Sequence, residues 1–119
     1  MRRNLLPCTR FSFTGRLRGD EPVREWLQSL VKSERLQLGQ AIQVLQVNGP
    51  ALPMPFARLL GSGLFELRER AGKVRYRIFY AFDGSRVVVL LHAVTKDQRV
   101  IDDDIALARR RLKDYWERR

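Results

Sequence analysis

The chain has 119 residues, and its 23 Lys and Arg against 13 Asp and Glu give a formal net charge of +10 and a pI near 11.0. This length predicts one domain over residues 1–119, and a hydrophobic content of 45% argues against disorder throughout. Cys8 and His92 are the single cysteine and histidine, which excludes an internal disulfide and a Cys/His zinc site. We therefore expect no metal or cofactor, and the excess of positive charge points to a polyanionic partner.

The sequence predicts neither a membrane span nor export. No apolar run approaches the roughly 18 residues that a membrane span needs. The basic start Met1-Arg2-Arg3 resembles a signal peptide, but no apolar segment follows it. We therefore expect a soluble cytoplasmic protein with no membrane partner, in which residues 1–8 are a loose lead-in.

Two helices are predicted after a short N-terminal strand. The alternation within Thr9–Thr14 predicts the strand, and Asp20, followed by Glu and Pro, has the position of a helix N-cap. Ser33 can cap a second helix, which Gly49 and Pro50 end. Because almost no linker separates the two helices, an antiparallel hairpin is predicted. The buried stripe of the first helix is predicted to consist of Val23, Trp26, Leu27, Leu30 and Val31.

Three strands and a last helix complete the predicted elements. Residues 50–56 contain three prolines, which predict an extended connector rather than a helix or a central strand. Strands are predicted over Leu64–Arg70, Val74–Phe82 and Arg86–Thr95. The third strand follows an Asp-Gly turn and is apolar on both faces, which is typical of a central strand. Asp102–Asp104 then opens a helix through Tyr115, and we prefer this helix-dipole interpretation of the acidic cluster to a metal site.

The resulting order, β–αα–βββ–α, predicts an α+β domain with a mainly antiparallel sheet. The helical hairpin, and the helices generally, are expected to pack on one face of this sheet. Tyr76 and Tyr80 share the apolar face of their strand with Ile78, so that core packing is their expected role.

Basic side chains gather on the other face of the predicted sheet. They are Arg68, Arg70, Arg75, Arg77, His92 and Lys96. Exposed strand arginines are usually only solvated, and a single histidine near a strand end is more often structural than catalytic. The alternative is a surface for phosphate, because the planar fork of arginine matches phosphate oxygens.

Such a face could cleave RNA without a metal ion. The reaction needs a base for the 2′-hydroxyl proton, cations for the pentavalent phosphorane, and an acid for the leaving 5′-oxygen. Arginines supply the second service. A lysine or histidine placed among cations could supply the first or the third.

Several segments together resemble the phage-derived, HigB-like branch of the RelE/ParE toxin superfamily. They are PVREWLQSL, NGPALPMPFARLLGSGLFELR, GLFELRERAGKVRYRIFYAF, VVVLLHAVTK and IALARRRLKDY. The resemblance covers roughly residues 9–115, and its motifs are specific only in combination. It implies a small RelE-like fold and the toxin of a type II toxin–antitoxin pair. It also implies a ribosome-dependent mRNA endoribonuclease, an mRNA interferase that leaves a 5′-hydroxyl fragment and inhibits translation.

The resemblance also implies roles for particular residues. Arg77 would stabilise the transition-state phosphate, and Arg68 would orient mRNA or take part in proton transfer. Lys96 would match the first basic residue of the family's post-strand motif, and His92 lies where relatives also tend to carry histidine. The remaining RNA-binding residues would be Arg70, Arg75 and Arg99.

The sequence departs from the relatives after Lys96. They continue with a second basic residue, whereas this chain has Asp97, and only Arg99 could compensate. A carboxylate beside an RNA phosphate is unfavourable because like charges repel. The departure weakens the prediction of cleavage and leaves the predicted fold unaffected.

Three functions are therefore compared. The first is the mRNA endoribonuclease, whose partners would be the ribosome, mRNA and a cognate antitoxin in a toxin–antitoxin hetero-oligomer. The second is a gyrase inhibitor of the ParE-like branch, because a fold does not determine a function. The third is a catalytically inactive nucleic-acid-binding relative, whose binding would fall steeply with salt.

Overall fold

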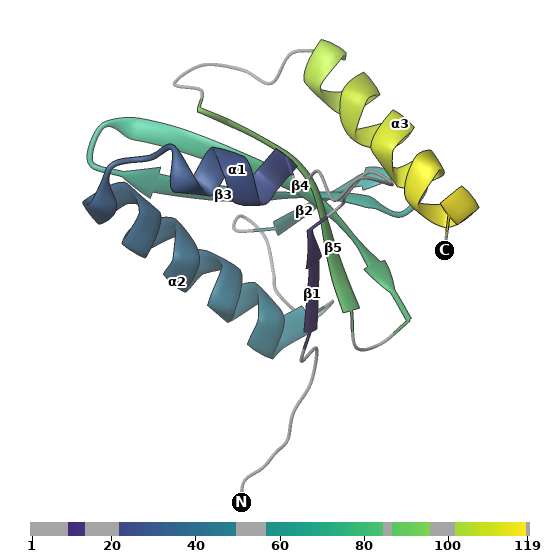
Figure 1. Ribbon diagram of the computed structural model, residues 1–119, viewed down its shortest axis with the longest axis horizontal. Coiled ribbons are helices and arrows are strands. Elements are labelled where there is room, and N and C mark those ends of the chain that lie inside the picture. The colour runs from purple at the N-terminus through teal and green to yellow at the C-terminus, as the bar shows by residue number, and fades with distance from the viewer. Residues whose placement is uncertain (1–9, 14–21, 50–56, 85–86, 96–101, 119) are drawn as a thin grey trace, which may run out of the picture.

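A five-stranded sheet with helices on both faces forms the described part of the chain (Figure 1). The computed structural model describes residues 10–13, 22–49, 57–84, 87–95 and 102–118. The strands are β1 (Arg10–Phe13), β2 (Ala57–Gly61), β3 (Leu64–Ala71), β4 (Val74–Asp83) and β5 (Val87–Thr95). The helices are α1 (Pro22–Gln28), α2 (Lys32–Asn48) and α3 (Asp102–Arg118).

The strands lie in the order β1-β5-β4-β3-β2. Strand β1 runs parallel to β5, and the four strands from β2 to β5 pair antiparallel. Strand β5 lies inside the sheet, as its apolar residues on both faces predict. The predicted α+β class with a mainly antiparallel sheet is confirmed and is consistent with a small RelE-like fold, although the observed order, β–αα–ββββ–α, has one strand more than predicted.

The edge strand β2 is an addition that the sequence pattern does not predict. Its five residues, ARLLG, show no clear alternation, and the predicted connector before it lies outside the described residues. The strand ends in the tight turn of residues 61–63, whose φ angles are 107°, 52° and 79°. Two of these three residues are glycine, which adopts positive φ without a steric cost. The turn folds β2 back onto β3.

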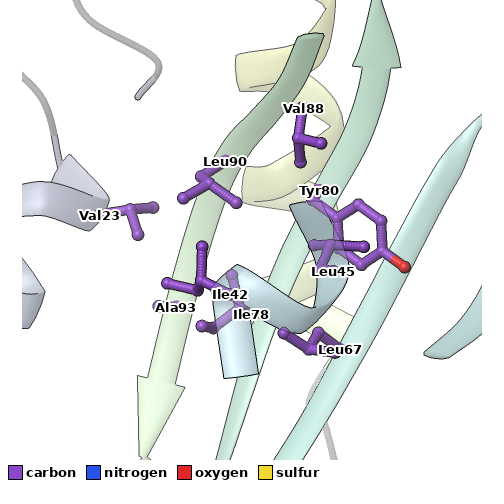
Figure 2. Packing of buried hydrophobic residues seen from close by; sticks show 9 residues of the cluster. All are labelled: Val23, Ile42, Leu45, Leu67, Ile78, Tyr80, Val88, Leu90 and Ala93. Atoms are coloured by element: carbon purple, nitrogen blue, oxygen red, sulfur yellow. The ribbon is translucent and has the colours of Figure 1, made fainter. Parts of the chain in front are cut away.

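The helices cover opposite faces of the sheet. The α1–α2 hairpin packs on one face, which we call the hairpin face, as predicted. Figure 2 shows the buried cluster there, which comprises Val23, Ile42, Leu45, Leu67, Ile78, Tyr80, Val88, Leu90 and Ala93. Helix α3 packs on the other face, the α3 face, against Leu64, Phe79, Ala81, Val89 and Leu91. The expectation that all helices share one face is therefore wrong for α3, because β4 and β5 carry apolar side chains on both faces.

The hairpin differs from the prediction at the start of its second helix. Helix α2 begins at Lys32 with Val31 in the N-cap position and no side-chain cap, so that Ser33 lies inside the first turn. Val31 is 61% exposed rather than part of the buried stripe, because the chain is already extended at this residue. The predicted end is confirmed: Gly49 has φ 56° and donates its backbone N–H to the Leu45 carbonyl.

The predicted role of the two tyrosines in the core is confirmed. Tyr76 and Tyr80 are buried on the hairpin face, where the rings of Tyr76 and Trp26 pack in a T-shaped arrangement and Tyr80 stacks on Phe65. Burial raises the pKa of Tyr76 to about 12, and a hydrogen bond with the Glu34 carboxylate adds to this shift. Burial also raises the pKa of Tyr80. Both phenols therefore stay neutral at physiological pH.

Helix α3 begins at Asp102, as predicted, and polar contacts supplement its small apolar interface of Ala108 and Leu112. Arg109 donates from Nη1 to the Gly61 carbonyl and from Nη2 to the Leu60 carbonyl, each at 3.1 Å. Further polar contacts link Arg111 to the Leu91 carbonyl, Tyr115 to Asp83, and Asp104 to His92. No helix in the described part of the chain is both long and apolar enough to cross a membrane.

Candidate nucleic-acid interface

Two arginine pairs lie side by side on the α3 face. In the antiparallel register of β3 and β4, Arg68 stands opposite Arg77, and Arg70 stands opposite Arg75. Side chains directly opposite each other have Cβ atoms roughly 5 Å apart, and like charges at this distance are destabilising. The β3–β4 hairpin that carries these pairs extends away from α3 (Figure 1). Four of the predicted site residues are therefore brought together, at a local electrostatic cost.

Glu66 relieves the charge repulsion within the inner pair, Arg68 and Arg77. The outer pair is Arg70 and Arg75. The Oε1 of Glu66 accepts a hydrogen bond from Arg68 Nε at 3.0 Å, and its Oε2 lies 3.7 Å from Arg77 Nη1. The Glu66 side chain is 1% exposed, whereas those of Arg77 and Arg68 are 12% and 40% exposed. Glu66 and the two arginines therefore form an ion-paired group whose carboxylate is buried and whose cations reach the surface.

The outer pair has no such compensation within the described residues. Arg70 and Arg75 are both exposed, and no ion pair involving either is formed there. Glu69 lies between Arg68 and Arg70 in the sequence, but its side chain is on the hairpin face, where it accepts a hydrogen bond from Gln37. Two uncompensated guanidiniums at a sheet surface form an electrostatic site for an anion. We call Glu66, Arg68, Arg70, Arg75 and Arg77 the basic half of the α3 face.

His92 lies on the α3 face too, but its side chain contacts the helix. Its Nε2 is 3.0 Å from Asp104 Oδ1, and its Nδ1 is 3.4 Å from Arg111 Nη1. The ring also stacks on Phe79, with centroids 5.8 Å apart and planes 12° apart. A ring that donates from Nε2 to the carboxylate and accepts at Nδ1 from the guanidinium satisfies both contacts. Phe79 stands opposite both Glu66 and His92, so it separates the histidine from the Glu66 group.

The remaining predicted site residues lie outside the described part of the chain. They are Lys96 and Arg99, and the same holds for Asp97. The structure adds one arginine that the sequence pattern does not single out: Arg58 on the edge strand β2 is exposed and stands opposite Glu66. Glu66 itself is also missed, although a signal exists. Glu66 alternates with Arg68 on the same face of its strand, and a carboxylate two residues from an arginine on one face can form an ion pair with it.

The comparison with known protein families decides the family of the chain. The model of the family described as Phage derived protein Gp49-like matches residues 25–113, a span that runs from α1 into α3. The chain belongs to this family. No curated protein sequence matches the chain at a significant level.

Gp49-like proteins belong to the RelE/ParE-like toxin superfamily and are generally toxin-like, and the matched span includes the whole basic half. The resemblance deduced from the sequence is thus confirmed at the level of the superfamily. Toxins of this kind imply an antitoxin as partner. The arginine pairs on β3 and β4 concentrate positive charge on one surface of the two strands.

Proposed function

We propose that this Gp49-like protein is the toxin of a type II toxin–antitoxin pair and cleaves mRNA on the ribosome, as in the HigB-like branch. The observation that carries the proposal is the exposed Arg70–Arg75 pair, whose positive charge no described carboxylate balances. It lies beside Arg68 and Arg77, which are both ion-paired with Glu66. An RNA backbone supplies successive phosphates that would relieve the repulsion within the outer pair while a neighbouring phosphate meets the inner one. Membership of a toxin-like family supports the biological role.

The chemistry assigned to the inner pair is transition-state stabilisation. The 2′-oxygen forms a bond to phosphorus while the bond from phosphorus to the 5′-oxygen breaks, which gives a cyclic phosphate and a 5′-hydroxyl fragment. Charge builds on the equatorial phosphoryl oxygens in between. The guanidinium of Arg77 is partly buried, and its charge is therefore less screened than that of an exposed arginine. We assign Arg77 to the phosphorane and Arg68, which is more exposed, to orienting the RNA.

The proton transfers need a base and an acid. Lys96 remains the predicted residue for one of them and lies outside the described residues. His92 remains a predicted participant, but both of its ring nitrogens already have partners, and these contacts support a role in holding α3. A histidine that donates to one carboxylate and accepts from one guanidinium would have to give up a contact in order to move a proton.

The partners follow from the same surface. A cognate antitoxin would neutralise the toxin by covering the basic half, for which an acidic segment has the complementary charge. The site of action would be the translating ribosome in the cytoplasm.

Primer extension on a defined mRNA in a reconstituted translation system tests the proposal. We expect discrete cuts within translated codons when protein and ribosomes are both present, and none when ribosomes are omitted. Intact mRNA would contradict the proposal. A parallel DNA-supercoiling assay with purified gyrase then separates the ParE-like alternative, in which gyrase is inhibited, from an inactive relative, in which it is not.

A further inference from the structure

Glu66 is the only charged residue among the described residues that is buried. It lies in the middle of β3, on the α3 face, between the apolar Leu64 and the half-exposed Arg68. An ionised carboxylate removed from water costs several kcal/mol unless charge and hydrogen bonds compensate. An apolar residue would fill this position of the strand at a lower cost. The retention of a carboxylate therefore calls for an explanation other than packing.

The contacts of Glu66 are unequal. Oε1 receives a hydrogen bond from Arg68 Nε at 3.0 Å. Oε2 lies 3.7 Å from Arg77 Nη1, which is beyond hydrogen-bond length, and it accepts no hydrogen bond from the described residues. One carboxylate thus restrains two guanidiniums that stand opposite each other, one through a hydrogen bond and the other through charge alone.

This arrangement lets two cations approach one phosphate. Without Glu66, the opposed guanidiniums of Arg68 and Arg77 would repel and turn toward solvent in different directions. With Glu66 buried between them, both guanidiniums are attracted to one carboxylate and are held on the same face of the sheet. An arginine has five N–H donors, of which Arg68 gives one, its Nε–H, to Glu66.

We propose that Glu66 is a positioning residue for RNA cleavage: it aligns Arg77 and Arg68 on the scissile phosphate without touching the RNA. This inference rests on the proposed function. The 1% exposure of Glu66 separates positioning from general-base catalysis, because a general base must come within hydrogen-bond reach of the 2′-hydroxyl. The buried carboxylate acts through the two arginines instead.

The test compares Glu66→Gln with a matched control on the same strand. Glutamine keeps the size of the side chain and removes its charge. Glu69→Gln makes the same chemical change three residues away on the hairpin face, where the carboxylate accepts a hydrogen bond from Gln37. Circular dichroism melting of both full-length variants establishes that they are folded at the temperature of the assay. Ribosome-dependent cleavage is then measured at varied mRNA concentration and at varied pH.

Positioning predicts a loss in kcat rather than in KM. Misalignment of a transition-state group by roughly 1 Å can cost about 100-fold, so that a fall of about 10-fold to 100-fold is expected for Glu66→Gln. The fall should be the same across roughly pH 6 to 9, since no proton on Glu66 takes part in the reaction. Glu69→Gln should keep the kcat and KM of the unmodified protein.

A spectroscopic signature that needs no RNA accompanies the kinetics. In ¹H–¹⁵N spectra of arginine side chains, the Nε–H of Arg68 should give a protected, shifted signal because it donates to Glu66. That signal should move to the position of solvated arginines in Glu66→Gln and stay in place in Glu69→Gln.

Each outcome has a separate meaning. If the unmodified protein cuts no mRNA on ribosomes, the proposed function fails and the inference fails with it. If the unmodified protein cuts and Glu66→Gln cuts at the same rate, only the inference fails. Loss of the acidic limb of the pH profile in Glu66→Gln would overturn positioning in favour of a base. An equal loss of kcat in Glu69→Gln would reduce the effect to a general weakening of β3.

Discussion

The two halves of the α3 face use arginine in opposite ways. On the half covered by the helix, Arg109 and Arg111 donate to the backbone carbonyls of Leu60, Gly61 and Leu91. On the basic half, Arg70 and Arg75 are exposed, and Arg77 is held by a buried carboxylate. The same side chain thus fastens a helix in one place and presents charge in the other.

The difference shows that a net charge of +10 does not locate a binding surface. In the sequence, Arg68 and Arg70, two and four residues after the buried Glu66, look no different from the arginines of α3. What separates them is the partner of each guanidinium. A guanidinium that satisfies carbonyls at the end of a strand is committed to the fold, whereas one opposite another arginine is a source of unbalanced potential.

The largest expected effect follows from removing Arg77. Arg77→Ala deletes the cation assigned to the phosphorane, and loss of one such group typically costs about 100-fold to 1,000-fold in rate. Growth arrest on induction of the variant in a host without antitoxin should therefore be lost, while the purified variant keeps its circular dichroism spectrum. Arrest as complete as that caused by the unmodified protein would remove Arg77 from the site.

Arg109→Gln should lower the stability of the protein and leave its cleavage activity unchanged, which is the converse of the result expected for Arg77→Ala. The substitution removes the two hydrogen bonds that fasten α3 to the end of β2, and hydrogen bonds to charged groups are worth about 1.5 to 3 kcal/mol. Urea unfolding should show this loss in the free energy of unfolding. Cleavage per folded molecule should stay unchanged, and a large drop in it would place Arg109 in the RNA site.

Smaller effects on stability and on cleavage are expected at the His92–Asp104 contact, where the two halves of the α3 face meet. His92→Ala and Asp104→Asn break the same contact from its two sides. If His92 serves to hold α3, both variants should lose about 1 kcal/mol of stability and little activity. A loss of cleavage that is confined to His92→Ala, with Asp104→Asn active, would instead assign proton transfer to the histidine.

The smallest effect concerns the hairpin face and appears only at high pH. Because the pKa of Tyr76 is about 12 in the folded protein and 10.0 ordinarily, folding favours the neutral phenol. Its contribution to stability is complete below pH 10 and is lost as the pH rises from 10 to about 12. The difference in unfolding free energy between the unmodified protein and Tyr76→Phe should shrink over that interval. A constant difference would contradict the raised pKa of Tyr76 in the folded protein.

Most of the fold could be predicted from periodicity, and the misses have local causes. The alternation in β3 and β4 and the apolar run of β5 give strands, faces and the central position of β5. Strand β2 is not predicted because its five residues, which end in glycine, show no alternation of apolar and polar side chains. The position of α3 depends on how distant strands pair. No local pattern shows that apolar side chains also gather on the α3 face, where the helix buries them.

The candidate site could be predicted only as a set of charges. Alternation places Arg68, Arg70, Arg75 and Arg77 on one face, and the structure confirms that placement. The sequence does not show that Arg68 and Arg77 share one carboxylate, because that depends on the register between two strands. Nor does it show that Asp104 reaches His92, which depends on how α3 lies on the sheet.

One measurement tests most directly whether position rather than total charge makes the site. The double variant Arg70→Gln/Arg75→Gln removes two charges from the basic half, and Arg110→Gln/Lys113→Gln removes two exposed charges from α3. Both variants carry a net charge of +8, which is the original +10 less two. In the ribosome-dependent cleavage assay at varied salt, the first variant should have a lower kcat/KM. The slope of log kcat/KM against log salt concentration should fall by the amount that corresponds to about two phosphate contacts. The second should match the unmodified protein, and an equal loss in both variants would contradict the account.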